Sequence, residues 1–241
     1  MPAPKTQRSF GQSISIFILC LATTAGCSAF GFRTADYHPA INAADFQMSV
    51  DNRFYPLVPG TVLRYTENDR GEVSEVEVTV LPETRMIMGV NCVVVHDVVR
   101  KYGKVAEDTY DWLARHKDGT VWYFGEDTKE TSAGGLVSTS GSWEAGINRG
   151  QPGILMPGEP QPGEPYRQEY GPGAAEDMGQ VVALNETVTV SAGTFAGCVK
   201  TREWSLLESG HEYKWYAPGV GLIKEEATGG AVMTLQSITH P

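Results

Sequence analysis

Apolar and polar side chains alternate along much of the chain after residue 60. In the segment EVSEVEVTV (72–80), every second residue from Val76 to Val80 is valine, and acidic or polar residues lie between them. A period of two residues is typical of a β-strand with one face buried and the other in water. The segment VNCVVVHDVV (90–99) is almost uniformly apolar and β-branched, which predicts a strand covered on both faces.

Short turn sequences separate these strand-like segments. Tyr-Gly-Lys (102–104) and Asp-Gly (118–119) each lie between two such segments, so residues 61–128 are predicted to form a meander. Six more strand-like segments follow residue 165, and no amphipathic helix is evident after the first 27 residues. We therefore predict a mainly β, single antiparallel, meander-rich domain over 51–241, built as a barrel, a curved half-barrel or a sandwich.

Glycine and proline interrupt the pattern over about 131–165, where Pro-Gly recurs at 152, 157 and 162. One interpretation is a long surface connection with fixed turns. The other is a lid with Ile154, Leu155 and Met156 as its apolar tip, since loops of this length are usually functional or disordered.

The first residues have the features of an export signal. Lys5 and Arg8 precede an apolar stretch of about a dozen residues, which spans roughly 18 Å and is shorter than the roughly 30 Å hydrocarbon core of a bilayer. The stretch ends in LATTAGCS (21–28), which resembles the lipobox of bacterial lipoproteins, except that Thr24 replaces the usual leucine. The resemblance implies removal of the signal and a lipid on Cys27. The alternatives are an ordinary cleaved signal and an uncleaved anchor.

The signal divides the chain and predicts its location. We expect a signal peptide over 1–26, a lipid anchor and tether over 27–50, and export to the bacterial cell envelope, periplasmic or outer surface, with the membrane as partner through the lipid. Loss of the signal would change the formal net charge from −10 to −12. An acidic surface disfavours nucleic acid as a partner.

Two cysteines, Cys92 and Cys198, remain in the predicted domain, each within a strand-like segment. An even pair in an oxidising compartment favours a disulfide, and two buried free thiols are the alternative.

Three fragments resemble a broad group of uncharacterised bacterial secreted proteins and lipoproteins. They are DNRFYPLVPGTVLRY (51–65), SAGTFAGCVKTREW (191–204) and HEYKWYAPGVGLIKEE (211–226), the last with the YAPGVGL turn. Some proteins with such endings look like the curved sheets of periplasmic lipoprotein carriers, whose concave face holds acyl chains. The resemblance also slightly favours the disulfide. It transfers no catalytic residue.

Motif searches predict no metal and no cofactor. The chain has no Gly-x-Ser-x-Gly, no phosphate-binding loop and no dinucleotide fingerprint, and the HExxH pattern fails because Trp215 stands in the last position. Clustered carboxylates are the main catalytic candidate. Pairing about the Asp-Gly turn predicts Asp108 near Asp127, and Asp111 near Phe124 with Glu126 diagonal.

Aromatic residues are the other candidate, and Tyr110, Trp112, Trp122 and Phe124 are predicted to line a concave apolar pocket. The preferred function is a membrane-anchored, non-catalytic envelope lipoprotein that binds an apolar or amphipathic ligand. One alternative is an envelope hydrolase that uses the carboxylates near Asp108, Asp111 and Glu126. Another is a structural or interaction module of the envelope.

Overall fold

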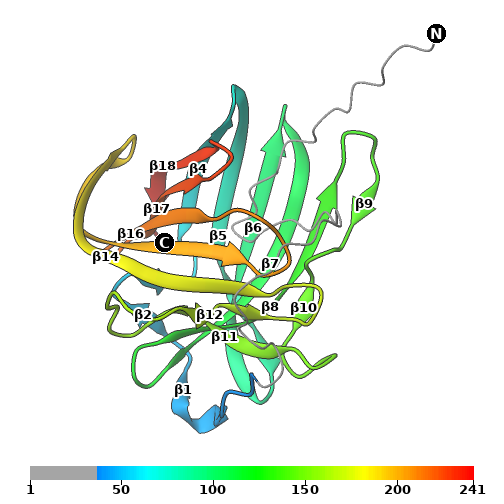
Figure 1. Ribbon diagram of the computed structural model, residues 1–241, viewed down its shortest axis with the longest axis vertical. Coiled ribbons are helices and arrows are strands. Elements are labelled where there is room, and N and C mark those ends of the chain that lie inside the picture. Colours follow the sequence, from blue (N-terminus) through cyan, green and yellow to red (C-terminus); the bar gives the residue numbers. More distant parts are fainter. Residues whose placement is uncertain (1–36) are drawn as a thin grey trace.

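The computed structural model describes residues 37–241, and most of this range is β-strand (Figure 1). Helical structure within the range is confined to the 3₁₀ helix η2 (Ala43–Asp45). None of these residues forms a helix of the length and apolar character needed to cross a bilayer. The signal predicted over 1–26 and the lipidation site Cys27 lie outside the described residues, so both stay predictions.

The strands fall into groups along the chain. The first three are short: β1 (Phe46–Gln47), β2 (Val50–Asn52) and β3 (Tyr55–Leu57). Five long strands follow: β4 (Val62–Asp69), β5 (Glu72–Ile87), β6 (Val90–Lys101), β7 (Lys104–His116) and β8 (Val121–Thr131). The next five are again short: β9 (Val137–Ser138), β10 (Trp143–Glu144), β11 (Gln151–Met156), β12 (Tyr166–Arg167) and β13 (Glu169–Tyr170). The last five are β14 (Asp177–Val190), β15 (Gly193–Ser205), β16 (Glu212–Ala217), β17 (Gly221–Ala227) and β18 (Val232–Thr239).

One antiparallel sheet contains nearly all of these strands. Its path runs β12-β14-β15-β16-β17-β18-β4-β5-β6-β7-β8-β11-β13. The two ends of the path, β12 and β13, are separated in sequence only by Gln168, whose amide donates to the carbonyl of Asp177 at 2.9 Å. The sheet is therefore nearly closed into a barrel, and Figure 1 shows β14 and β16 running across the front of the long strands β5–β7. The predicted mainly β, antiparallel class is confirmed.

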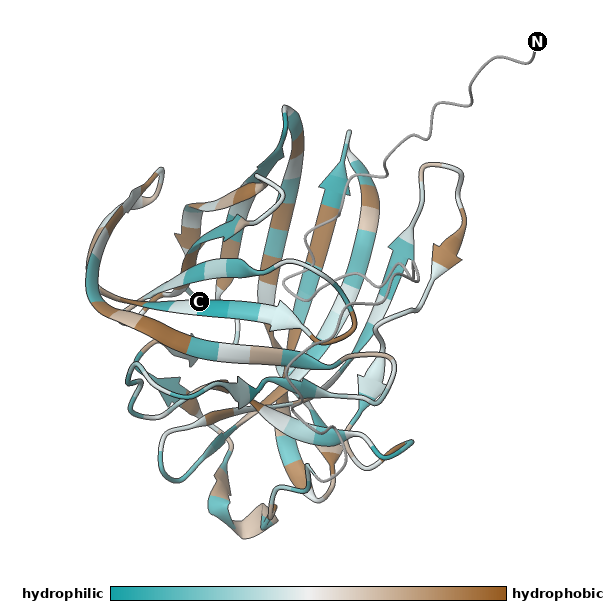
Figure 2. Cartoon of the chain, viewed as in Figure 1, coloured by the Kyte–Doolittle hydropathy of each residue, from teal (hydrophilic) through white to brown (hydrophobic). Residues whose placement is uncertain are grey.

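The alternating pattern sets which face of each strand is buried. The β5 valines at 76, 78 and 80 are buried, whereas Glu75 is exposed and Glu77 is partly exposed. In β6 the run from Cys92 to Val95 is buried throughout, as its uniform composition predicts. Brown and teal bands alternate along the long strands in Figure 2. The predicted meander corresponds to β4–β8.

The Gly/Pro-rich region 131–165 is partly built into the sheet. β9, β10 and β11 all pair with β8, and β11 also pairs with β13. Leu155 and Met156 are buried in β11. This placement excludes the interpretation of these residues as the tip of a lid, because their side chains already contribute to the core.

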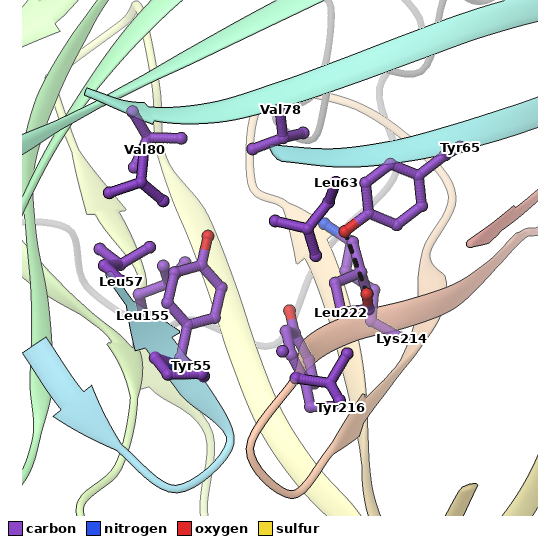
Figure 3. Close-up of a pocket in the computed structure, with 14 residues that line it drawn as sticks. Tyr55, Leu57, Leu63, Tyr65, Val78, Val80, Leu155, Lys214, Tyr216 and Leu222 are labelled. Atoms are coloured by element: carbon purple, nitrogen blue, oxygen red, sulfur yellow. Dashed lines mark hydrogen bonds between the residues drawn. The ribbon is translucent and has the colours of Figure 1, made fainter. Parts of the chain in front are cut away.

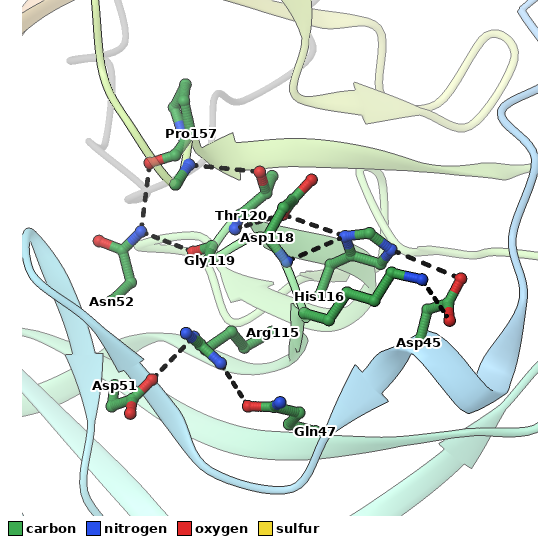
Figure 4. Close-up of polar contacts among 12 residues, drawn as sticks. Asp45, Gln47, Asp51, Asn52, Arg115, His116, Asp118, Gly119, Thr120 and Pro157 are labelled. Atoms are coloured by element: carbon green, nitrogen blue, oxygen red, sulfur yellow. Dashed lines mark hydrogen bonds and ion pairs between the residues drawn. The ribbon is translucent and has the colours of Figure 1, made fainter.

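Residues 37–50, predicted as part of a tether, pack against the sheet. β1 pairs with the end of β7, and the Asp45 carboxylate accepts from Lys117 at 2.8 Å. The Asn52 amide, from the following strand, donates to the carbonyls of Gly119 at 2.9 Å and Pro157 at 3.2 Å (Figure 4). The N-terminal strands are therefore fixed to the Asp-Gly turn between β7 and β8.

The predicted disulfide between Cys92 and Cys198 is wrong. Both cysteines are free and buried. Cys92 lies on β6 and Cys198 on β15, and β5, β4, β18, β17 and β16 separate these strands in the sheet. Burial raises the pKa of both thiols, which keeps them in the less reactive protonated form.

Candidate functional site

A small cavity lies beneath the β2–β3 hairpin, and we call it the hairpin cavity (Figure 3). Apolar side chains of β3, β4, β5 and β17 form most of its wall, with Lys214 and three tyrosines, and the Tyr65 hydroxyl donates to the carbonyl of Leu222 at 3.0 Å. Its volume is only about 30 Å³. Because a single water needs roughly 10–15 Å³ measured in this way, the hairpin cavity has room for a few waters at most and not for a ligand.

A larger cavity lies between β8, β10 and the loop after β13, and we call it the β10 cavity. Its volume of about 380 Å³ falls in the range of roughly 300–1,000 Å³ that is typical of small-molecule sites. It is lined by Arg85, Trp112, Glu126, Asp127, Ser142, Trp143, Glu144, Ile147, Asn148, Gly171, Pro172 and Ala174. The difference in size makes the β10 cavity the candidate functional site.

Two glycines allow the backbone to form this cavity. Gly125 of β8 has a φ of +131°, and a Cβ at this position would lie 2.3 Å from the Trp143 carbonyl oxygen. Opposite Gly125, the register of β7 and β8 shifts between Trp112 and Leu113, which is a β-bulge. A Cβ at Gly171 would lie 2.6 Å from the Trp143 Cβ. β10 can therefore lie against β8 and the loop after β13 only because both positions lack a side chain.

Two tryptophans form the aromatic wall of the β10 cavity. The Trp143 ring packs edge-on against Tyr123, with ring centroids 5.5 Å apart. The guanidinium of Arg85 lies 3.9 Å from the centroid of the Trp112 ring and is held by the Glu144 carboxylate at 2.6 Å. The Arg85 side chain is 46% exposed, so the charge that covers Trp112 lies at the solvent side of the cavity.

Glu126 is the most unusual polar residue of the wall. It is only 4% exposed, and its Oε2 has no hydrogen-bond partner. Burial raises its pKa well above the ordinary range, and the nearby acidic side chains Glu169 and Asp111 raise it further. The pKa of Asp111 is itself raised to about 7 by burial, while the Tyr123 hydroxyl, which donates to Asp111 at 2.7 Å, opposes the shift. Burial therefore favours the protonated form of both the Asp111 and the Glu126 carboxyl groups.

The remaining carboxylates of the wall have different surroundings. The Asp127 side chain is about half exposed, with Lys129 at 3.8 Å, and Glu144 pairs with Arg85. The wall therefore contains three carboxyl groups and one guanidinium, and burial favours the protonated form of Glu126. The Ser142 hydroxyl binds the backbone of Thr128. It accepts from the Thr128 amide at 2.9 Å and donates to the Thr128 carbonyl at 3.1 Å.

The four predicted aromatic residues do not gather around one cavity. Trp112 lines the β10 cavity. Tyr110 stacks on His96, with ring centroids 4.3 Å apart. Trp122 and Phe124 contact Phe46 of β1, at centroid distances of 6.5 and 5.4 Å. The N-terminal strand thus packs against part of the aromatic cluster that was expected to face a ligand.

The predicted pairing of the carboxylates is wrong by up to two positions. Asp108 lies opposite Lys129 rather than Asp127, and Asp111 lies directly opposite Glu126. Two features shift the register, each by one position. The turn pairs Arg115 with Val121, one residue beyond the predicted partner, and the β-bulge between Trp112 and Leu113 adds the second position. Asp111 and Glu126 are therefore brought together across β7 and β8, as cross-strand neighbours on one face.

Asp108 is separated from that pair. It contacts His96 Nε2 at 2.7 Å, and successive residues of a strand point to opposite faces, so Asp108 and Asp111 lie on different sides of the sheet. Sequence reasoning missed Arg85 and Glu144 as site residues. No local pattern marks them, because each reaches the cavity only through the pairing of distant strands.

No metal site is evident in the part of the chain that the structure describes, where no three His, Cys, Asp or Glu side chains are grouped to hold an ion.

Comparisons with known proteins reach only solved structures. No protein-family model and no curated protein matches the chain. A protein from Bacteroides fragilis, described as exported and with a YmcC-like fold, is 17% identical, with a TM-score of 0.46 over 78% of this chain and 99% of that one. A protein from Parabacteroides distasonis, described as a lipoprotein, is 15% identical, with a TM-score of 0.42 over 77% of this chain and 98% of that one.

Proposed function

We propose that this protein is a lipid-anchored protein of the bacterial cell envelope that binds a small amphipathic molecule in the β10 cavity. The observation that supports the binding function is a ligand-sized cavity whose wall combines apolar and polar side chains in about equal parts. Trp112, Trp143, Ile147 and Pro172 offer apolar surface, and the unpartnered oxygen of Glu126 offers a buried hydrogen-bonding group.

The anchoring part of the proposal depends on the lipobox-like end of the signal. Only nine residues separate Cys27 from Tyr37, the first described residue, and they span at most roughly 35 Å when extended. Tyr37 packs edge-on against Tyr170, with centroids 5.5 Å apart, and Tyr170 adjoins Gly171 of the cavity wall. A lipid on Cys27 would therefore keep the cavity close to the membrane, where amphipathic molecules are concentrated.

Native mass spectrometry of the protein purified from its own membrane tests both parts. We expect acyl chains on Cys27 and a retained small molecule of a few hundred daltons. Ala174→Phe, which places a ring at the cavity wall, should abolish retention while leaving the lipid mass unchanged. Ala133→Phe, in the exposed turn after β8, is the matched control and should retain the molecule.

The two parts fail independently in this experiment. A mature chain that begins downstream of Cys27 without a lipid would refute the anchoring part. Equal retention by both alanine variants would show that the β10 cavity does not hold the molecule and would refute the binding part.

A second candidate function is hydrolysis by a pair of carboxyl groups. Glu126 and Asp127 both line the cavity, one buried with a raised pKa and the other about half exposed. A carboxyl group with a raised pKa, together with a second carboxyl group, is the combination that acid/base hydrolysis uses, as in glycosidases.

Isotope incorporation distinguishes hydrolysis from binding without a known substrate. The protein would be incubated with an envelope extract in ¹⁸O-labelled water, and products would be searched for label by mass spectrometry. Hydrolysis predicts labelled products with the unmodified protein and with Asp108→Asn, and none with Glu126→Gln. Absence of protein-dependent label would leave binding as the function.

A further inference from the structure

The Arg85 guanidinium occupies a position in the β10 cavity that a cationic ligand could take instead. It lies over the Trp112 ring at 3.9 Å, and the carboxylate of Glu144 holds it from the side at 2.6 Å. An aromatic face together with a carboxylate is the combination that recognises organic cations. Both contacts of Arg85 come from the protein itself, so the chain already contains a cation bound in this manner.

The wall of the cavity holds fewer cations than carboxyl groups. It contains three carboxyl groups and one guanidinium, and Glu126 is 4% exposed with an Oε2 that has no partner. A buried carboxyl group without a counter-charge costs free energy, and a cation bound beside it offsets that cost. The unpartnered oxygen and the occupied aromatic face are independent observations on the same cavity.

We propose that the β10 cavity binds an organic ammonium group, which displaces the Arg85 guanidinium from the face of Trp112 and is paired by the carboxyl groups of Glu144 and Glu126. This inference rests on the proposed binding function and names the polar part of the ligand. Ile147 and Pro172 border the same space and would contact the apolar part. The ammonium is either that of a free small amine or that of a lipid headgroup.

The arrangement makes Arg85 a competitor of the ligand. Arg85→Met removes the competing charge but keeps an unbranched side chain of similar length, so ammonium affinity should rise. A cation–π contact corresponds to roughly 0.5–2 kcal/mol, which converts to a change of roughly twofold to thirtyfold. Trp112→Leu should weaken binding by a similar factor. A purely structural role of Arg85 predicts the opposite result, namely weaker binding in Arg85→Met.

Isothermal titration calorimetry of the purified full-length mature protein, in a maltoside detergent, tests the proposal with defined probes. Choline is compared with 3,3-dimethyl-1-butanol, which has nearly the same shape and no charge. Dihexanoylphosphatidylcholine is compared with dihexanoylphosphatidylglycerol, which has the same chains and no ammonium. We expect the ammonium member of each pair to bind at least tenfold more tightly. Tighter binding of the lipid than of choline would identify a headgroup source, and the reverse would identify a free amine.

Proton release gives a further readout. Because burial raises the pKa of Glu126, a bound cation should lower it and release up to one proton, which titrations in buffers of different ionisation enthalpy detect. Glu126→Gln should abolish this release. Circular dichroism of each variant shows whether it folds. Ile147→Ala changes an uncharged residue of the cavity wall and is the control for proton release, which it should leave unchanged.

The outcomes separate this inference from the proposed function. Equal affinity for the charged and uncharged members of both pairs overturns the ammonium proposal and leaves amphipathic binding intact. Weaker or unchanged choline affinity in a folded Arg85→Met variant also overturns it. Absence of binding by all four probes, together with no retained molecule in native mass spectrometry, refutes both.

Discussion

Two groups of buried carboxyls in the same barrel differ in how their charge is compensated. On β15, β16 and β17, Lys214 lies among Glu203, Glu212 and Glu225 at 3.0, 3.4 and 3.6 Å. On β7 and β8, Asp111 and Glu126 lie opposite each other, and Oε2 of Glu126 has no partner within the described chain. We call these the lysine cluster and the acid pair.

The comparison shows that only one of the two groups contains a cation of its own. Lys214 is 4% exposed, and the three glutamates raise its pKa against the effect of burial, so its charge is retained. The acid pair lacks such a cation, and burial raises the pKa of both carboxyls. The lysine cluster contains an internal cation, although burial and the neighbouring Glu212 still raise the pKa of Glu225. The acid pair has no such cation, and its Glu126 lines the β10 cavity.

Removing the cation of the lysine cluster should produce the largest effect. Lys214→Met leaves three buried glutamates without their counter-charge, and breaking a buried ion pair in this way costs about 3–5 kcal/mol. We expect a loss of this size in the free energy of unfolding, measured by urea titration at pH 7. Glu126→Gln, the matching change in the acid pair, should be neutral or stabilising because it removes an uncompensated acid.

A similar loss for Lys214→Met and Glu126→Gln would contradict the comparison. It would mean that the acid pair is compensated as fully as the lysine cluster. The difference between the two variants is therefore more informative than either value alone.

The backbone beside the acid pair should be the next most sensitive feature. Gly125→Ala forces a side chain into a φ of +131° and to within 2.3 Å of the Trp143 carbonyl oxygen. We expect a loss of about 2–3 kcal/mol in unfolding free energy, because left-handed strain alone costs roughly 1–3 kcal/mol. Ligand binding should be lost as β10 moves away from β8.

Gly71→Ala is the control for this variant. Gly71 has a φ of +94°, and nothing lies within 4 Å of the Cβ it would gain. It should cost roughly 1–3 kcal/mol through left-handed strain alone and leave binding unchanged. Equal effects of the two changes on binding would show that the close approach of β8 and β10 does not form the cavity.

The acid pair also predicts how stability depends on pH. The pKa of Asp111 is about 7 in the folded protein, against an ordinary value of 3.8, so between these values the folded state holds a proton that the unfolded state has lost. Stability is then fully present below pH 4 and falls as pH rises to about 7, by at most about 1.4 kcal/mol per pH unit for one group. Burial raises the pKa values of Glu67 and Asp177 to about 7 as well, so they contribute in the same direction.

Urea unfolding at intervals from pH 4.5 to 7.5 measures this slope. Asp111→Asn should reduce it by roughly 1 kcal/mol per pH unit. Glu75→Gln, at an exposed position of β5, should not change it. A slope that is unaffected by Asp111→Asn would show that Asp111 is ionised in the folded protein.

The fold class could be predicted from sequence because its signals are local. Alternating valines and Asp-Gly or Tyr-Gly-Lys turns are each contained in a few residues, and they define β4–β8 correctly. The disulfide prediction failed because it depended on which strands become neighbours, and five strands lie between those of Cys92 and Cys198 in the sheet. Closure of a barrel depends on such long-range order.

The candidate site was predictable only in part, for a related reason. Trp112 and Glu126 were identified by residue type, but their grouping was not, since the bulge opposite Gly125 moves the register by one position. The bulge at this glycine decides whether Asp111 lies opposite Gly125 or Glu126. Arg85 and Glu144 lie 59 positions apart and meet only when β5 and β10 are placed on the sheet.

A surface ion pair should show the smallest effect. Its coupling energy is the reference against which that of the buried lysine cluster can be compared. Arg64 and Glu77 face each other across β4 and β5 at 2.9 Å, and their side chains are 48% and 38% exposed. Water and ions screen such a pair, which contributes about 0.2–1 kcal/mol. A double-mutant cycle with Arg64→Ala and Glu77→Ala should give a coupling energy in this range that decreases with added salt. Coupling between Lys214 and Glu203, at nearly the same distance, should be several times larger and nearly independent of salt, because burial rather than distance separates the two pairs.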